Sequence, residues 1–282
     1  MVKAKNIVAV VVLYNPQEWV LENMGAYHSL LENVVIVDNS ELSNKELLDK
    51  IKTMFQVHII VNHENKGIAT ALNQGIEKAI HLGAQWILTM DQDSFFNEDM
   101  LKDYLNLLHS MNNKKGIAAL GPNYEKVFYT EEISNVETLI TSGTLLNVNV
   151  FTQLKGFKVE LFIDEVDNDF CYRAQLKGYN LYRCNKIFMN HSLGNEQIVT
   201  TIFGAQKKRN LHSPVRLYYI VRNSLYMSLM YKTSFPNSIK KTKKDVLVRI
   251  KNNLLYGNQK WSTFKFVILG FMDFKRGKFG KY

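Results

Sequence analysis

Two carboxylates one residue apart form the strongest local signal for chemistry in the sequence. Asp91 and Asp93 follow directly on the apolar run 86–90. Alternate side chains of an extended segment point the same way, so both carboxylates are expected to face one ligand. Hard divalent cations take carboxylate oxygens together with the phosphate oxygens of a substrate. The pair therefore suits a Mg²⁺ or Mn²⁺ ion that carries a diphosphate, although Asp-x-Asp alone occurs by chance in many proteins.

A second acidic group comprises Asp164, Glu165, Asp167 and Asp169. Apolar residues bracket it, which places it at the edge of a core rather than on an open surface. A carboxylate held against apolar walls can have a raised pKa and act as a general base. Acidic residues are also favoured at a helix start, where they meet the positive end of the helix dipole. Both interpretations hold at once if Asp167 faces a cleft while Asp169 caps the following helix.

Several common site motifs are missing from the sequence. There is no Gly-x-Gly-x-x-Gly after the first strand, no phosphate-binding P-loop and no Gly-x-Ser-x-Gly turn. His63 and Glu64 begin a zinc-protease pattern, but Gly67 stands where its second histidine is needed. His191 is a lone histidine, which is structural by default and gains a role only beside a metal ion.

The elements that must position these residues alternate between strand and helix through residue 93. Four short apolar runs, rich in β-branched residues, predict strands buried on both faces. They lie at 7–13, 33–37, 57–61 and 86–90. Three segments with helical periodicity separate them. They lie at 19–31, 44–54 and 68–81. This alternation is typical of an α/β domain with a mostly parallel sheet flanked by helices.

Polar residues gather where such a sheet binds its ligands, beyond the carboxyl ends of the strands. Three of the strands end in Tyr14-Asn15, in Asp38-Asn39 and in the Asp91 to Asp93 pattern. Because Asn, Asp and Ser are common turn residues, a plain turn would explain one such end more readily than all three.

The regular alternation loosens after residue 100. A helix at 99–111 and a strand at 116–120 are expected, followed by further strands within 133–146 around a turn at 141–144. From Val215 onward the pattern is helical, with aromatic and basic residues mixed.

The net charge of +9 is distributed unevenly along the 282 residues. Residues 201–282 carry 18 basic and 2 acidic residues, a charge of +16, while residues 1–200 carry −7. This shift predicts a domain at 1–200 and a basic helical region at 201–282 packed on it. Two cysteines make no disulfide framework, and no run reaches the length of a spanning helix. The N-terminal apolar run is at the short limit for a signal peptide, and Tyr14-Asn15-Pro16 follows it where small cleavage-site residues are needed. A soluble or peripheral protein of the reducing cytosol is expected.

Six blocks together resemble the family 2 glycosyltransferases, inverting enzymes with the Rossmann-like GT-A fold. Each block is unspecific alone, but they follow the family's order and cover roughly residues 6–195. The blocks are Val11–Pro16, Val35–Ser40, Asn65–Gly75, Leu88–Ser94, Thr141–Gly143 and Phe162–Arg173. The Asp91–Ser94 and Phe162–Arg173 blocks, with His212–Asn223, look most like the rhamnosyltransferase branch. That branch uses dTDP-L-rhamnose to build bacterial O-antigen or capsule polysaccharides.

The resemblance implies a role for each matching residue. The nucleotide would be held by Tyr14, Asn15, Asp38, Asn65, Lys66 and Gly67, with Asp38 accepting from the pyrimidine N3–H and Asp91 contacting the nucleotide's sugar. Asp93 would bind Mg²⁺ or Mn²⁺, with His191 as a second ligand. Asp167 would be the catalytic base, although Val166 replaces the first acid of the family's Glu-Asp pair and leaves Asp164 and Asp169 as alternatives. Contacts with the acceptor or a diphosphate would come from Ser142, Gly143, Arg216 and Arg222.

The resemblance also implies partners. The donor would be dTDP-rhamnose or, alternatively, a UDP-sugar such as UDP-galactofuranose, UDP-glucose or UDP-GlcNAc. The acceptor would be a glycan on a polyprenyl diphosphate, reached at the cytoplasmic face of the bacterial membrane, where the basic region would bind peripherally. Two alternatives remain for that region: its lysines simply face water, or it binds nucleic acid, for which the sequence carries no recognised motif.

Overall fold

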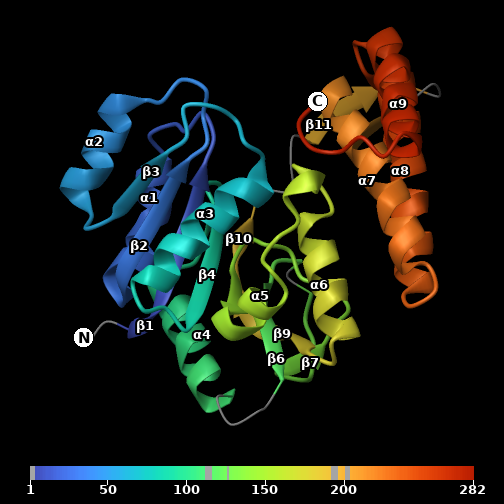
Figure 1. Cartoon of the computed structure of the whole chain (residues 1–282). Helices are drawn as coiled ribbons and strands as arrows, with labels where there is room; N and C mark the ends of the chain where they lie inside the picture. The colour runs from blue at the N-terminus through green and yellow to red at the C-terminus, as the bar shows by residue number, and fades with distance from the viewer. Residues whose placement is uncertain (1–3, 112–115, 126, 192–195, 201–203) are drawn as a thin grey trace. The chain divides into compact units, whose positions relative to one another are not determined.

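The structure is a computed structural model that describes residues 4–111, 116–125, 127–191, 196–200 and 204–282 (Figure 1), with the backbone only at Lys5, His191 and Glu196. The chain divides into two compact units. The first comprises Met1–Lys158 with Val166–Ser192, and the second comprises Val159–Glu165 with Leu193–Tyr282. The boundary thus falls near residue 192 rather than 200. A short segment from the middle of the chain also belongs to the second unit.

An eight-stranded mixed sheet forms the centre of the first unit. Its order is β3-β2-β1-β4-β8-β6-β9-β7, with β8 antiparallel to both neighbours and β7 antiparallel to β9. The strands are β1 (Ala4–Leu13), β2 (Leu31–Asp38), β3 (His58–Val61), β4 (Trp86–Asp91), β6 (Ile117–Asn123), β7 (Ile133–Asn135), β8 (Thr144–Asn147) and β9 (Asn180–Phe188). A separate two-stranded pair joins β5 (Ser94–Phe95) to β10 (Asn190–His191).

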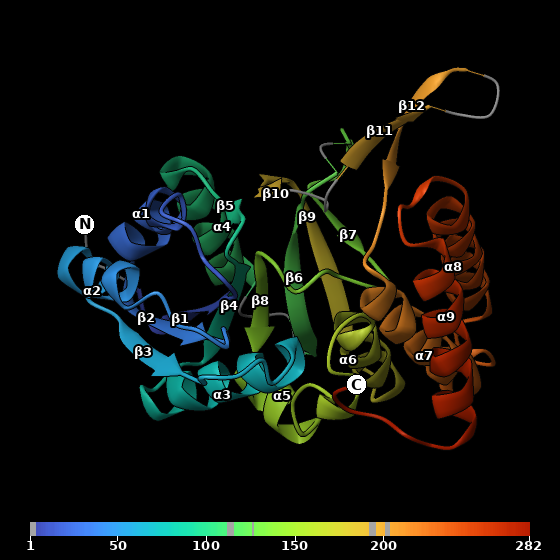
Figure 2. The same ribbon diagram turned by 90° about the horizontal axis from the view of Figure 1, so that it is seen from above.

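Helices cover both faces of this sheet, as Figure 2 shows, with α1 and α4 on one face and α3, α5 and α6 on the other. The helices of the unit are α1 (Val20–Leu30), α2 (Lys45–Met54), α3 (Ile68–His81), α4 (Glu98–Met111), α5 (Val148–Gln153) and α6 (Val166–Leu176). The direction of winding reverses at β1, because β2 and β3 lie on one side of it and β4 on the other. In open α/β sheets, ligands bind at such a switch point, beyond the carboxyl ends of the strands.

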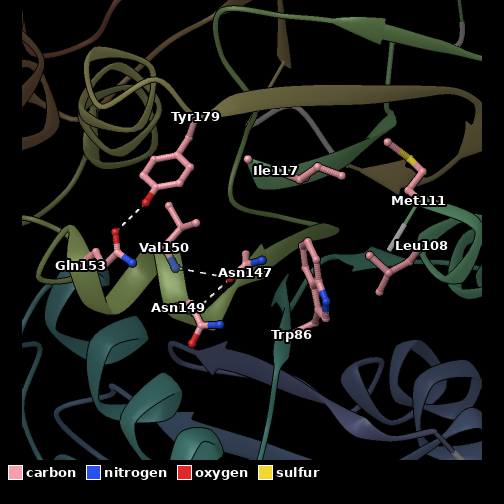
Figure 3. Close-up of a pocket in the computed structure, with 10 residues that line it drawn as sticks. Trp86, Leu108, Met111, Ile117, Asn147, Asn149, Val150, Gln153 and Tyr179 are labelled. Carbon is pink, nitrogen blue, oxygen red and sulfur yellow. Dashed lines mark hydrogen bonds between the residues drawn. The ribbon is translucent and has the colours of Figure 1, made fainter. Parts of the chain in front are cut away.

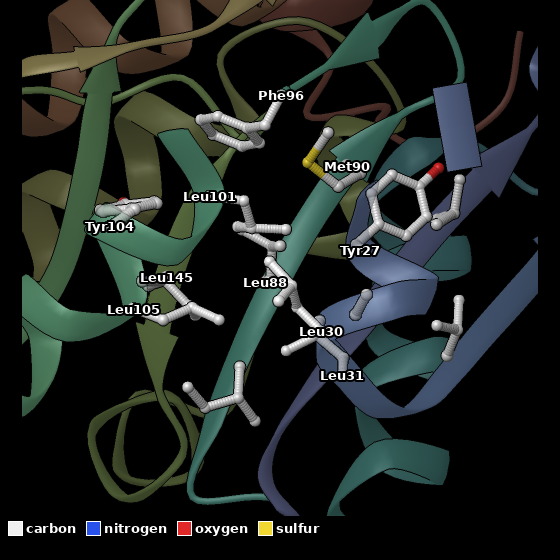
Figure 4. Packing of buried hydrophobic residues seen from close by; sticks show 14 of the residues in the cluster. Tyr27, Leu30, Leu31, Leu88, Met90, Phe96, Leu101, Tyr104, Leu105 and Leu145 are labelled. Carbon is white, nitrogen blue, oxygen red and sulfur yellow. The ribbon is translucent and has the colours of Figure 1, made fainter. Parts of the chain in front are cut away.

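Strand β1 is apolar from Ile7 to Leu13, where it is buried on both faces. Alternate residues, including Ile7 and Leu13, join the core beneath α1 and α4, where Tyr27, Met90 and Tyr104 also pack (Figure 4). On the opposite face Val10 meets α3, which approaches so closely that a Cβ at Gly75 would overlap the Val10 side chain. The core thereby holds the ends of β1 and β4 in fixed register.

The second unit is built around three helices: α7 (Pro214–Tyr231), α8 (Pro236–Tyr256) and α9 (Lys260–Lys275). Ser213 caps α7 by accepting a hydrogen bond from the backbone N–H of Arg216 at 3.3 Å. A hairpin of β11 (Glu196–Thr200) and β12 (Gln206–Asn210) precedes them, and the 3-10 turn η1 (Val159–Leu161) lies in the segment 159–165. No helix within the described ranges is long and apolar enough to cross a membrane.

The predicted strands and helices up to residue 120 are confirmed, and α3 matches its predicted bounds. The expected strands within 133–146 and the helical C-terminal region are confirmed as well. One local prediction is wrong. Residues 92 and 93 form a turn between β4 and β5, so Asp91 and Asp93 are not alternate residues of one extended strand.

Candidate active site

Asp38 occupies the carboxyl end of β2, beside the end of β1, where Leu13 is its register partner. The residue is fully buried. Its Oδ1 accepts from the Ser40 hydroxyl at 2.6 Å and from the Ser40 backbone N–H at 3.1 Å. Its Oδ2 is buried with no hydrogen-bond partner in the described part of the chain. Buried polar atoms are rarely left unpaired, so this oxygen is suited to a donor from a ligand.

A network of amides shapes the wall beside Asp38. The Asn39 Oδ1 accepts from Asn62 Nδ2 at 3.0 Å and from the backbone N–H of Lys66 at 3.1 Å. The Asn65 Oδ1 accepts from Asn39 Nδ2 at 3.3 Å and from the Gly67 N–H at 3.0 Å. These bonds tie the loop that begins α3 to the end of β2. The structure therefore gathers four of the residues predicted to hold the nucleotide, and it adds Asn62, which sequence reasoning missed.

Gln92 joins the ends of β1 and β4. Its Oε1 accepts from the Tyr14 N–H at 2.9 Å, and its Nε2 donates to the Tyr14 carbonyl at 3.2 Å. Asn23 on α1 donates to the Gln92 carbonyl at 2.8 Å, and the Asn15 N–H donates to the Ser40 hydroxyl at 2.8 Å. The middle residue of the Asp-x-Asp pattern thus connects the two strand ends by hydrogen bonds. Its partner Tyr14 is 78 positions away, so the residues around Gln92 in the sequence do not indicate this contact.

The acidic pattern itself lies at the carboxyl end of β4. The Asp91 N–H donates to the Ser142 hydroxyl at 3.1 Å, and the Ser94 hydroxyl donates to Asp93 Oδ1 at 3.4 Å. Pairing of β5 with β10 sets the backbone of His191 opposite Ser94. The side chain of His191 lies outside the described residues. Among the side chains described, no three His, Cys, Asp or Glu form a metal cluster. The carboxylates of Asp91 and Asp93 supply the kind of oxygen ligand that divalent cations prefer.

Ser142 and Gly143 form a tight turn against β4. The Gly143 N–H donates to the Thr89 carbonyl at 2.7 Å, and its φ of 73° favours glycine. A Cβ at Gly143 would overlap the sulfur of Met189 and lie 2.8 Å from Pro122 Cγ. Since Ser142 is buried and bonded to Asp91, this turn positions the end of β4 directly.

Asp167 and Asp169 share the first turn of α6 but have different surroundings. Asp169 is fully buried and accepts from Arg173 Nε at 2.7 Å, an ion pair that joins successive turns of the helix. Arg173 also donates to the carbonyls of Leu154 and Gly156. Asp167 is partly exposed, accepts from the Asn168 N–H at 2.8 Å and lines a small pocket. Of the two acids, Asp167 is the one that is partly exposed and lines a pocket.

Arg222 does not fit the predicted contact with an acceptor or diphosphate. Its side chain is fully buried, and all five of its N–H groups have acceptors within the second unit. The acceptors are the carbonyls of Glu160, Leu161 and Gly280, the Asn223 amide oxygen and the Tyr218 hydroxyl. Its role is structural. Arg216, by contrast, is half-exposed and donates to Asp164 Oδ1 at 3.2 Å.

A pocket of about 290 Å³ lies at the opposite end of β4, where the strand begins; Figure 3 shows the residues that line it. It is lined by Trp86, Asn147 and Tyr179, among others, and Trp86 is the first residue of β4. Asp91 ends that strand, and strands rise about 3.3 Å per residue, so the pocket is about 17 Å from the carboxyl end of β4. It is separate from the site described above.

Comparisons with known proteins relate the sequence and the fold to those of glycosyltransferases. Residues 9–134 match the model of Glycosyl transferase family 2. The dTDP-rhamnosyl transferase RfbF of Shigella flexneri is 33% identical over 248 residues, which span 79% of each chain.

Solved structures show the same fold at low sequence identity. TarS 1-349 of S. aureus, in complex with UDP-GlcNAc, superposes with a TM-score of 0.59 at 15% identity, covering 97% of this chain and 81% of that one. GalNAc-T7 with UDP, GalNAc and Mn²⁺ gives a TM-score of 0.59 at 13% identity, covering 96% of this chain and 56% of that one. The expected GT-A fold, an α/β fold, is confirmed. The chain is a glycosyltransferase, and it belongs to glycosyltransferase family 2.

Proposed function

We propose that this glycosyltransferase moves L-rhamnose from dTDP-L-rhamnose to a hydroxyl of a glycan acceptor, with inversion at the anomeric carbon. The observation that carries the proposal is the 33% identity with a dTDP-rhamnosyl transferase over 79% of both chains.

The unpaired oxygen of Asp38 supports a pyrimidine nucleotide as the donor's carrier. A thymine or uracil base offers one N3–H, and the buried Asp38 Oδ2 accepts it. A hydrogen bond to a charged acceptor is shorter and stronger than one between neutral groups. Tyr14, 42% exposed at the end of β1, offers an aromatic face beside the base. Asn15, Asn65, Lys66 and Gly67 complete the nucleotide site.

Asp93 and His191 would hold a Mg²⁺ or Mn²⁺ ion, and Asp91 would contact the sugar of the nucleotide. When bound, the ion stabilises the charge that develops on the diphosphate leaving group. The Ser142 hydroxyl fixes Asp91 in place by accepting a hydrogen bond from the backbone N–H of Asp91. Gln92 holds the end of β1 against the turn that follows β4. The base and the diphosphate would thus be bound by strand ends that hydrogen bonds join to one another.

Asp167 would act as the general base that takes the proton from the acceptor hydroxyl. Asp169 is unsuited to that role because Arg173 holds its carboxylate in a buried ion pair. One base and direct displacement invert the anomeric configuration, through a transition state with oxocarbenium character.

Helix α9 supports an acceptor carried on a membrane. Exposed apolar side chains recur every three or four residues along α9 and form one face of it. They are Trp261, Phe264, Ile268 and Phe271, at 86%, 52%, 41% and 48% exposure. Lys260, Lys265 and Lys275 lie among them on the same helix. A basic face with apolar side chains suits an anionic lipid surface, so we place the enzyme at the cytoplasmic face of a bacterial membrane, acting on a polyprenyl-diphosphate-linked glycan of an O-antigen or capsule.

A panel of nucleotide sugars tests the donor. Thermal unfolding of the full chain is measured with Mg²⁺ and, in turn, dTDP-L-rhamnose, UDP-glucose, UDP-GlcNAc and UDP-galactofuranose. We expect the largest shift with dTDP-L-rhamnose, because a ligand bound only by the native state raises the unfolding temperature. A larger shift with any UDP-sugar would overturn the rhamnose assignment and leave the glycosyltransferase assignment intact.

A further inference from the structure

Four titratable groups from separate segments of the second unit lie close together. Asp164 belongs to the segment 159–165, His212 and Arg216 flank the cap of α7, and Arg249 lies on α8. Arg216 donates to Asp164 Oδ1 at 3.2 Å, and the backbone N–H of His212 donates to Oδ1 of Asn253 on α8 at 3.0 Å. Both Arg216 and Arg249 act electrostatically on His212. We call Asp164, His212 and Arg216 the polar cluster.

Two atoms of the polar cluster are buried without a partner. Asp164 Oδ2 and His212 Nε2 have no hydrogen-bond partner among the residues that the structure describes. The Asp164 side chain is only 13% exposed, while that of Arg216 is 46% exposed. Two orphaned polar atoms with an exposed guanidinium beside them have the character of a binding site rather than of a packed core.

The backbone that presents Asp164 is strained. Phe162, Asp164 and Glu165 have φ values of 66°, 62° and 65°, a region that side-chain-bearing residues seldom adopt. Asn223 Nδ2 holds this path by hydrogen bonds of 2.9, 2.7 and 3.0 Å to the carbonyls of Leu161, Ile163 and Asp164. Such strain persists only where surrounding structure enforces it, and it concentrates at ligand sites.

The protonation of His212 narrows the chemistry of the ligand. Burial, together with the positive charges of Arg249 and Arg216, lowers the pKa of His212 to about 4, against the weaker opposite effect of Asp164. The imidazole is therefore neutral at physiological pH. The orphaned carboxylate oxygen repels a phosphate but accepts from a hydroxyl. A neutral imidazole exchanges hydrogen bonds with hydroxyls, and Arg216 donates to their oxygens.

We propose that the polar cluster binds hydroxyl groups of the sugar acceptor, with Asp164 Oδ2 and His212 Nε2 facing a pair of hydroxyls and Arg216 donating to one of them. This inference rests on the proposed function and deepens it by assigning the acceptor's site.

Ligand-observed NMR on the full chain tests this site without knowledge of the natural acceptor. The probes are methyl glycosides of L-rhamnose, galactose, glucose and GlcNAc at millimolar concentration, with and without saturating dTDP and Mg²⁺. The variants are Asp164→Asn and His212→Gln, with Asp245→Asn, an exposed acid on α8, as the matched control. Thermal unfolding confirms that each variant is folded, and His212→Gln remains informative if Asp164→Asn is not.

We expect at least one methyl glycoside to bind in the presence of dTDP, and binding to weaken about tenfold or more in both variants but not in the control. Displacement of the glycoside by dTDP would instead place it at the donor site and overturn the proposal. Binding unchanged in the variants, or absent for all probes in the wild type, would also overturn it. Neither result bears on the donor, because binding of dTDP is measured separately in the same samples.

Discussion

Two fully buried aspartates with opposite surroundings allow a sharp test of the nucleotide site. Asp38 has one oxygen without a partner, whereas the carboxylate of Asp169 is paired with Arg173 at 2.7 Å. We consider Asp38→Asn, which keeps the shape and the Oδ1 acceptor for Ser40 but replaces Oδ2 by an NH₂ group. Asp169→Asn is the matched control, because it makes the same chemical change at an equally buried position.

The two variants should differ in both binding and stability. In Asp38→Asn a donor faces the N3–H of the base, so a hydrogen bond to a charged group, worth about 1.5–3 kcal/mol, is lost. The Kd for dTDP should then rise about 10- to 150-fold. The free energy of unfolding should stay the same or increase, because an unpaired buried charge is removed. Asp169→Asn leaves Arg173 without its counter-ion and should lower that free energy by about 2–4 kcal/mol, with dTDP binding unchanged.

Isothermal titration calorimetry with dTDP and Mg²⁺ gives the first quantity, and chemical denaturation without ligand gives the second. A Kd for dTDP of Asp38→Asn within threefold of the wild-type value would refute the role of Asp38 in binding the base. The same conclusion follows if Asp38→Asn loses as much stability as Asp169→Asn, since Asp38 would then be a structural residue and not a ligand-binding one.

Two further predictions concern the second unit. In Arg222→Lys the ammonium group cannot satisfy the five acceptors of the guanidinium. We therefore expect denaturant unfolding to show a free energy of unfolding lower by about 3 kcal/mol or more, with donor binding retained. Normal stability with weakened donor binding would instead support a contact between Arg222 and the diphosphate. The pKa of His212, read from its ring protons by NMR, should be about 4 and should rise in Arg216→Gln, because one of the charges that lowers it is removed. Since the unfolded chain takes up this proton near pH 6.5 and the folded chain only near pH 4, stability should fall as the pH drops from about 6.5 to 4, and less so in that variant. A pKa of His212 near 6.5 would contradict the burial and charge that the structure assigns to it.

Much of the first unit could be predicted from the sequence because its signals are local. Strand β1 is apolar from Ile7 to Leu13, since both of its faces are covered there, and α3 has a clear apolar periodicity. Because ligands bind at the carboxyl ends of strands in such sheets, the strand pattern alone points to Asp38 and Asp91. These predictions depend on properties of neighbouring residues, which a sequence shows directly.

The features that escaped prediction all depend on distant contacts. Gln92 pairs with Tyr14 across 78 positions, and its side-chain direction follows from a turn that an extended Asp-x-Asp pattern does not suggest. Arginine suits phosphates, which favours a ligand contact for Arg222, yet its acceptors include carbonyls of residues 160, 161 and 280. The left-handed backbone at Phe162 and Asp164 has no sequence signal, because neither residue is a glycine.

The central claim is most directly tested by following dTDP release from dTDP-L-rhamnose in the presence of Mg²⁺, for the wild type and for Asp167→Asn. We expect the wild type to consume dTDP-L-rhamnose faster than any UDP-sugar. We also expect Asp167→Asn to lower the rate about 10²- to 10⁴-fold, the usual contribution of a general base, while the Kd for the donor stays within threefold. Faster consumption of a UDP-sugar, or a near-normal rate in Asp167→Asn, would contradict it.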